Sequence, residues 1–148
     1  MDPTDPLAAW RAGRRCADAA ATEAAGAELA GLLPRGSALL LEGPMGAGKT
    51  TFVRGLARGL GIAGDLTSPS YALVQVHDRP DGRRLIHVDA YRLADPRQAE
   101  GLLLDEIAGP DDLVVIEWPE RLGDRLPRPH LRLRLAETPD GGRFLRLG

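Results

Sequence analysis

The residues most clearly suited to binding or catalysis form a glycine-rich stretch around the only lysine of the chain. Residues 43–50 match the spacing of a nucleotide-binding phosphate loop, G-x-x-x-x-G-K-[ST]. Glycines let several backbone N–H groups approach a phosphate closely, and a helix that follows adds its positive end. The basic residues are 18 arginines and Lys49, which indicates a position where a guanidinium does not fit. The predicted phosphate-binding residues are Gly43, Gly46, Ala47, Gly48, Lys49 and Thr50.

Two acidic residues stand where such a loop needs them, at the ends of apolar runs. Glu117 ends the run that begins at Leu113, and Asp89 ends an earlier one. An acid on a neighbouring strand, together with the Thr50 hydroxyl, is the usual partner of Mg²⁺ beside a phosphate loop. We therefore predict Thr50 and Glu117 as metal-binding residues. Lys49, Asp89 and Glu117 are the predicted catalytic residues, with Asp89 reaching the metal or the attacking water.

Short apolar runs alternate with helical patterns, which favours an α/β fold. We expect a three-layer phosphate-loop NTPase fold, with a mainly parallel central sheet and antiparallel hairpin additions. A single domain over residues 1–148 is expected, with an irregular N-terminal segment over 1–20. The predicted helices are Thr22–Leu33 (capped by Thr22 or Asp18), Lys49–Leu60 and Asp95–Ile107. The predicted strands are Ala38–Leu41, Tyr71–His77, Leu85–Asp89, Leu113–Ile116 and a C-terminal hairpin over Leu131–Leu135 and Phe144–Leu147.

Composition excludes several classes of protein. The 148 residues are 43% hydrophobic and 27% charged, with a net charge of −2, so a polybasic nucleic-acid binder is not expected. No apolar run approaches a bilayer span, and the first residues lack the apolar region of a secretory signal. The lone Cys16 cannot form an internal disulfide. We expect a cytoplasmic protein without membrane contact.

The sequence also limits which phosphate-loop protein this can be. The chain contains no Asn, so it lacks the N-K-x-D motif with which GTPases read guanine. The signature of transporter ATPases, LSGGQ, is absent as well. A small phosphotransferase is still open, although the C-terminal third is mainly a strand pair with little room for a substrate domain. Guanine recognition by that route is therefore excluded, and the expected ligand is a nucleoside triphosphate with Mg²⁺, which the family resemblance given next makes ATP.

Four motifs in order resemble the bacterial TsaE family, the small ATPases of tRNA threonylcarbamoyladenosine synthesis. They are Gly46–Phe52, Thr67–Tyr71, the run His-Val-Asp-Ala-Tyr-Arg-Leu at 87–93, and Ile-Glu-Trp-Pro at 116–119. The resemblance covers about Thr22 to Leu135. It implies a slow ATPase that binds the TsaB–TsaD heterodimer and supports repeated threonylcarbamoyl transfer to the adenosine beside the anticodon, and that contacts tRNA only indirectly.

The resemblance also assigns roles to single residues. Thr51 joins the phosphate-binding stretch, and Trp118 matches an aromatic residue beside the nucleotide. Thr67–Tyr71 matches a switch-like segment, which γ-phosphate and Mg²⁺ order in such proteins. The chain departs from the family pattern at Pro44-Met45, at Ser70 and, in a looser fit, over Leu102–Glu106. The departure at 44–45 should leave ATP binding intact, whereas the one at 102–106 puts that region's partner contacts in question.

Two other functions fit the same residues. A nucleotide-gated regulatory module would bind ATP to change its affinity for partners, with hydrolysis incidental. A small phosphotransferase would move the phosphate to a metabolite. Stimulation of hydrolysis by the partner heterodimer would favour the ATPase, and phosphate on an added metabolite would favour the phosphotransferase.

Overall fold

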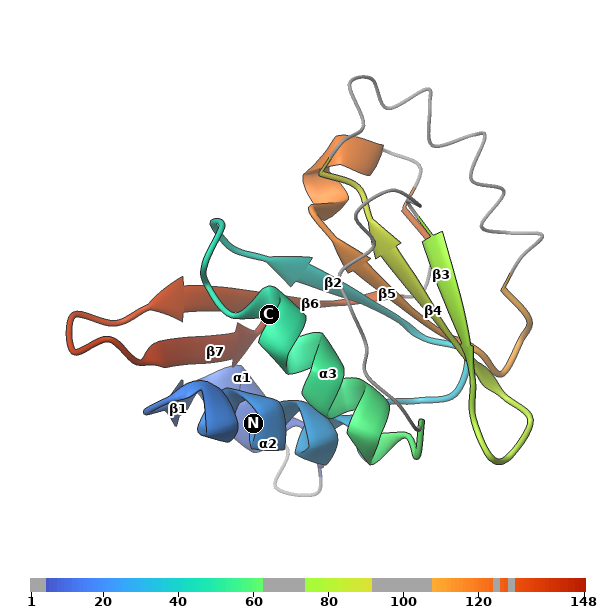
Figure 1. The fold of residues 1–148 in the computed structure, drawn as a ribbon, viewed down its shortest axis with the longest axis horizontal. Helices are drawn as coiled ribbons and strands as arrows, with labels where there is room; N and C mark the ends of the chain where they lie inside the picture. The colour runs from blue at the N-terminus through green and yellow to red at the C-terminus, as the bar shows by residue number, and fades with distance from the viewer. Residues whose placement is uncertain (1–4, 63–73, 92–107, 124–125, 128–129) are drawn as a thin grey trace.

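A mixed seven-stranded sheet forms the centre of the molecule (Figure 1). The computed structural model describes residues 5–62, 74–91, 108–123, 126–127 and 130–148. The order of strands is β1-β7-β6-β2-β5-β4-β3. The helices are α1 (Ala8–Ala12), α2 (Ala19–Ala30), α3 (Lys49–Gly59) and the 3₁₀ helix η2 (Pro119–Leu122). The strands are β1 (Arg14–Cys16), β2 (Ala38–Glu42), β3 (Val74–Asp78), β4 (Arg84–Asp89), β5 (Leu113–Glu117), β6 (His130–Glu137) and β7 (Arg143–Leu147).

The four central strands are parallel and the additions at both edges are antiparallel. β2 pairs in parallel with β5 and β6, and β4 pairs in parallel with β5. The hairpins β3–β4 and β6–β7 extend the sheet outward. β2 and β5 are almost wholly buried, which is why they read as continuous apolar runs rather than as alternating ones. The α/β fold and the sheet arrangement expected from the sequence are confirmed.

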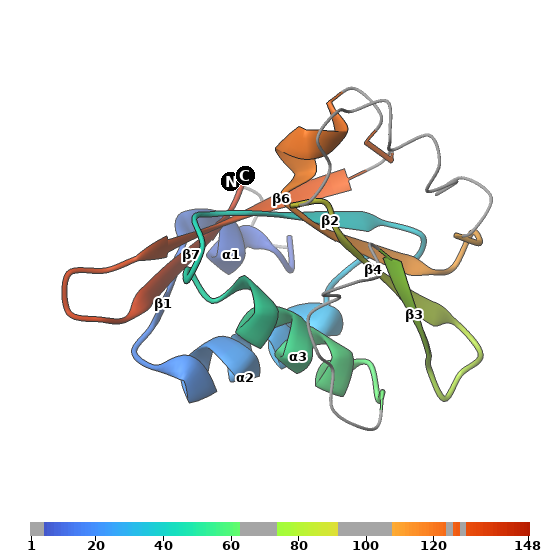
Figure 2. The ribbon, with the colours of Figure 1, turned by 45° about the horizontal axis from the view of Figure 1, so that its top comes forward.

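The sheet separates two hydrophobic clusters, one on each of its faces, and helices cover both. α2 and α3 lie side by side on one face, and η2 lies on the other (Figure 2). Phe52 and Leu56 of α3 pack with Leu39 and Leu41 of β2 in the first cluster. Leu40 of the same strand points to the second cluster, where it meets Leu122 of η2. Successive side chains of β2 thus point to opposite faces of the sheet and pack into both clusters, which fixes the register of this strand.

The helices α2 and α3 approach closely because glycines line their contact. A Cβ atom at Gly55 would lie 1.8 Å from the carbonyl oxygen of Glu23, and one at Gly26 would lie 2.3 Å from that of Phe52. The carbonyls belong to helix backbone and cannot yield without moving a helix. This contact holds α3, and with it the first turn that follows the phosphate loop, at a fixed distance from α2.

We expect Gly55→Ala to destabilise the protein by about 1–3 kcal/mol, since overpacking a close helix contact forces the backbones apart. Gly31→Ala is the matched control, because a Cβ there meets nothing nearer than the Glu28 carbonyl oxygen at 3.7 Å. Chemical denaturation of both variants measures the difference. Equal stability of Gly55→Ala and wild type would contradict the close contact.

One expectation about the N-terminal part was wrong. Residues 1–20 were expected to be irregular, but they contain α1 and β1. Trp10 of α1 is buried and meets Phe52 edge to face, with ring centroids 6.4 Å apart, so tertiary packing stabilises a helix too short to form alone. Of the two caps expected for the next helix, Thr22 and Asp18, the structure has Asp18. Its side chain accepts a hydrogen bond from the Ala21 N–H at 2.8 Å, so α2 begins at Ala19, slightly before the expected start near Thr22.

Some expectations lie outside the described residues. They are the segment Thr67–Tyr71, the helix from Asp95 to Ile107 and the stretch Leu102–Glu106. Within the described residues, no helix combines the length and the hydropathy that crossing a membrane requires.

Candidate functional site

The phosphate loop joins the carboxyl end of β2 to the amino end of α3. Gly46 and Gly48 have φ angles of 83° and 97°, a left-handed conformation that side-chain-bearing residues rarely adopt. Gly48 is also the N-cap residue, directly before the first residue of α3, Lys49. The loop therefore places the N-terminus of α3 at the carboxyl ends of the central strands, where its positive end can bind an anion.

A cavity of about 390 Å³ opens between this loop and the ends of β4 and β5. It brings together most of the residues that the sequence singled out. Gly46, Gly48, Lys49, Thr50, Thr51, Asp89, Glu117 and Trp118 line it, together with Met45, Tyr91 and Arg143. Gly43 and Ala47 do not. The Gly43 carbonyl instead accepts a bond from Lys49, and Ala47 is buried in the core with its N–H bonded to the Pro44 carbonyl at 3.1 Å.

Lys49 lies at the floor of the cavity, buried to 6% exposure. Its Nζ donates to the Gly43 carbonyl oxygen at 2.6 Å and lies 3.5 Å from the centroid of the Trp118 ring. Burial lowers the pKa of Lys49, while the carboxylates of Glu117, Glu120 and Asp89 act in the opposite direction. The ammonium group is thus held by a carbonyl and an aromatic face, both of which a phosphate oxygen can replace as partners.

Asp89 and Glu117 are direct neighbours across two parallel strands. β4 and β5 pair so that Asp89 lies opposite Glu117, the last residue of each strand. Glu117 is buried at 3% exposure, and Asp89 accepts a hydrogen bond from the Tyr91 N–H at 3.0 Å. Two carboxylates and the Thr50 hydroxyl are hard oxygen donors, the type that Mg²⁺ takes together with phosphates and water. The donors at this edge therefore fit the predicted metal.

His87 is a residue of the site to which the sequence analysis gave no role. Its Nε2 lies 2.6 Å from Glu117 Oε2, and both side chains are buried. The other ring nitrogen, Nδ1, has no hydrogen-bond partner among the residues that the structure describes. His87 stands two positions before Asp89 on β4, so both side chains point to the same face of the sheet. The contact fixes one oxygen of Glu117 and leaves the other for the cavity.

Trp118 has an unusual backbone conformation for its type. Its φ of 58° and ψ of 51° are left-handed, the one such case among the described residues that are not glycine. The conformation costs roughly 1–2 kcal/mol for a residue with a side chain. It places the indole over Lys49 and against Tyr91, with ring centroids 5.1 Å apart. Strain of this kind concentrates at functional sites.

Arg143, which lines the cavity, is another residue of the site that sequence reasoning missed. It begins β7, far along the chain from the loop, yet its Nη2 donates to the Gly46 carbonyl at 2.9 Å. Its Nε is buried without a hydrogen-bond partner. No local pattern marks this arginine among 18, because only the pairing of β6 with β7 brings it to the loop. The cavity thus has two cations, Lys49 and Arg143, facing two carboxylates.

Comparisons with known proteins agree with this geometry. A crystal structure of Bacillus subtilis YdiB superposes with a TM-score of 0.74 at 30% identity, and the match covers 90% of this chain and 81% of that one. The tRNA threonylcarbamoyladenosine biosynthesis protein TsaE of Streptomyces coelicolor is 45% identical over 112 residues, 74% of this chain and 75% of the relative. The protein of the same name from Treponema pallidum is 39% identical over 132 residues, 87% of this chain and 96% of the relative.

A family model also matches most of the chain. The model described as threonylcarbamoyl adenosine biosynthesis protein TsaE matches residues 16–145. That range includes the phosphate loop, both acids at the strand ends and Arg143. The resemblance first indicated by four short motifs therefore extends over nearly the whole described sheet, and this chain belongs to the TsaE family.

Proposed function

We propose that this protein is a Mg²⁺-dependent ATPase that serves tRNA threonylcarbamoyladenosine synthesis through the TsaB–TsaD heterodimer. The observation that carries the proposal is the cavity in which a phosphate loop, Lys49 and the acids Asp89 and Glu117 meet. A cavity lined by cations on one side and carboxylates on the other suits a polyphosphate with its metal. The pathway is proposed from the names of the relatives, which state tRNA threonylcarbamoyladenosine biosynthesis.

The proposed roles follow from position. The loop N–H groups and Lys49 bind the terminal phosphates, and the positive end of α3 adds to that attraction. Thr50 and Glu117 would hold Mg²⁺, which would neutralise charge on the β- and γ-phosphates. Asp89 lies beside Glu117, where it can orient the attacking water. When a nucleotide binds, its phosphate takes the place of the Trp118 ring as the partner of Lys49, and the Trp118 ring packs beside the nucleotide.

His87 positions Glu117 in this proposal. We expect His87→Phe, which keeps a ring but removes the hydrogen bond, to lower the turnover rate about tenfold or more while nucleotide affinity changes little, because Glu117 loses a charged hydrogen bond. Steady-state ATPase measurements that separate kcat from KM provide the test. The control His130→Phe alters a histidine at the start of β6, outside the cavity lining. A changed KM with unchanged kcat would contradict a positioning role.

We expect adenine nucleotides to bind in preference to guanine nucleotides, since the chain has no Asn and so lacks the guanine-reading N-K-x-D motif. Competition titration against a fluorescent ATP analogue measures the preference. Displacement of the analogue by GTP at the same concentration as ATP would contradict it.

The partner proposal has its own experiment. The described residues that line this cavity come from the phosphate loop, α3, the ends of β4 and β5 and the start of β7. We therefore propose that its ATP turnover acts on a protein partner. Thr67–Tyr71 is proposed as the segment that couples nucleotide state to that partner. Capture of TsaB–TsaD on the immobilised chain, with ATP, ADP or no nucleotide, should be strongest in one nucleotide state. Equal capture in all three states would remove the coupling, and tight capture of tRNA alone would contradict an indirect role.

A further inference from the structure

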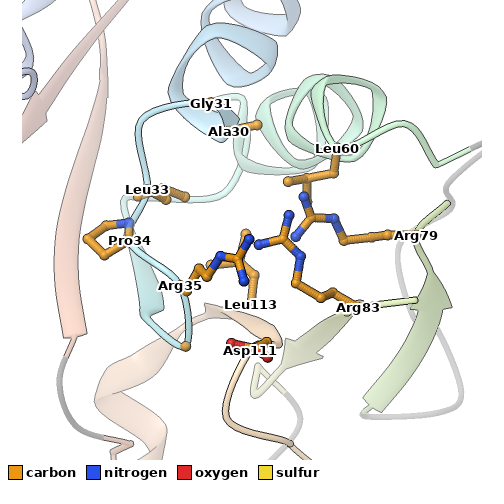
Figure 3. Close-up of a pocket in the computed structure, with 11 residues that line it drawn as sticks. Ala30, Gly31, Leu33, Pro34, Arg35, Leu60, Arg79, Arg83, Asp111 and Leu113 are labelled. Atoms are coloured by element: carbon orange, nitrogen blue, oxygen red, sulfur yellow. The ribbon is translucent and has the colours of Figure 1, made fainter. Parts of the chain in front are cut away.

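A second cavity, of about 260 Å³, lies at the opposite end of the sheet from the phosphate loop. Its walls come from the connection between α2 and β2, from the β3–β4 hairpin and from the start of β5 (Figure 3). The phosphate loop follows the last residue of β2, whereas part of this cavity's lining comes from the residues just before the first residue of β2. The two cavities share no lining residue.

Three arginines converge on this second cavity. Arg35 comes from the connection before β2, and Arg79 and Arg83 come from the β3–β4 hairpin, with their guanidinium groups turned toward one another (Figure 3). Like charges brought together at this range repel unless an anion lies between or beside them. The clustering therefore requires a compensating negative charge.

The carboxylates nearby compensate for only part of this charge. Arg79 and Arg83 both pair with one carboxylate, that of Asp81, and Asp111 is the acid in the cavity wall. Three cations thus share two carboxylates. Among the described residues, the exposed Arg35 guanidinium has no ion pair and the buried Arg79 Nε has no hydrogen-bond partner. The buried Arg79 N–H and the Arg35 guanidinium lie at the same cavity, and an anion bound there would accept hydrogen bonds from both.

The rest of the lining is apolar. Leu33, Leu60 and Leu113 face the cavity between the arginines and the ends of α2 and α3. A ligand of this site therefore has an anionic end for the guanidinium groups and a less polar remainder for the leucines. The volume admits a small group and not a polymer.

We propose that this arginine cavity binds a phosphate monoester, separately from the nucleotide at the phosphate loop. A monoester has three terminal oxygens and close to two negative charges, which matches three guanidinium forks, whereas a carboxylate has two oxygens and one charge. The phosphate belongs either to a small phosphorylated molecule or to the phosphorylated end of an RNA, which share this chemistry. The proposal does not depend on ATP hydrolysis at the first site.

The test is calorimetric titration of inorganic phosphate and of ribose 5-phosphate into the full chain. A non-hydrolysable ATP analogue and Mg²⁺ saturate the phosphate loop beforehand, so that it does not compete. We expect one saturable site, weakened about tenfold or more in Arg35→Gln, because one charged hydrogen-bonding partner is lost. Arg35 has no ion pair to lose, so this variant should fold normally, and Arg83→Gln serves as the second variant.

The control is Arg15→Gln, an exposed arginine of β1 at the opposite edge of the sheet. It should bind phosphate like the wild type. Absence of saturable binding, or binding that both cavity variants leave unchanged, would overturn the proposal. So would equal affinity for succinate. Comparing a short RNA with a 5′-phosphate against the same RNA with a 5′-hydroxyl distinguishes the sources. Tighter binding of the phosphorylated RNA than of ribose 5-phosphate assigns the site to an RNA end, and the reverse order assigns it to a small molecule.

Discussion

Replacement of Lys49 by alanine is expected to abolish tight ATP binding while the fold is preserved. The change removes the single ammonium group of the cavity, and a charged hydrogen bond of this kind contributes about 1.5–3 kcal/mol, or tenfold to more than 100-fold in affinity. Lys49 touches the Gly43 carbonyl and the Trp118 ring, neither of which belongs to the packing between α2 and α3. Isothermal titration with ATP and Mg²⁺ measures the loss.

Two further variants sharpen this prediction. Lys49→Arg should also fail to bind, because the planar guanidinium is longer and cannot act as a point charge under the loop. Arg58→Ala removes a cation from the exposed side of the same helix, where Arg58 pairs with Glu23 at 3.0 Å, and should bind ATP normally. Unchanged affinity in Lys49→Ala would contradict the assignment of the phosphate loop.

Replacement of Glu117 by glutamine is expected to leave ATP binding nearly intact and to remove most of the turnover, about 100-fold. The amide keeps the shape of the side chain and an oxygen or nitrogen for His87, but it removes the negative charge at the metal and the water. Glu28→Gln, which alters an exposed carboxylate of α2 outside the cavity lining, is the matched control and should retain turnover. Single-turnover hydrolysis separates chemistry from binding, and wild-type rates in Glu117→Gln would return this residue to a structural role. Asp89→Ala should also lower turnover while retaining more of the binding.

Much of the fold could be predicted because its signals are local. The run from Leu113 to Ile116 and the loop with Lys49 each contain their own pattern, a buried strand in one and a glycine turn before a helix in the other. The hairpin β3–β4 was likewise indicated by its turn residues at Arg79–Gly82. Once β4 and β5 are assumed to pair in parallel, their last residues, Asp89 and Glu117, are expected at the same end of the sheet.

What could not be predicted depends on contacts between distant parts of the chain. Arg143 reaches the phosphate loop only because β7 is paired next to β6, and His87 meets Glu117 only because β4 lies beside β5. α1 was missed for the same reason, since five residues form a helix there through the packing of Trp10 on Phe52. The sequence offered both Thr22 and Asp18 as caps of α2, and the structure has the Asp18 cap.

We propose that ATP turnover at this cavity is coupled to the TsaB–TsaD heterodimer. The rate of phosphate release tests this coupling, measured for the full chain alone, with TsaB–TsaD, and with TsaB–TsaD plus tRNA, using Glu117→Gln to set the background. We expect slow release by the chain alone and faster release with the heterodimer, with no phosphate on any added metabolite. The same rate in all three mixtures would contradict it.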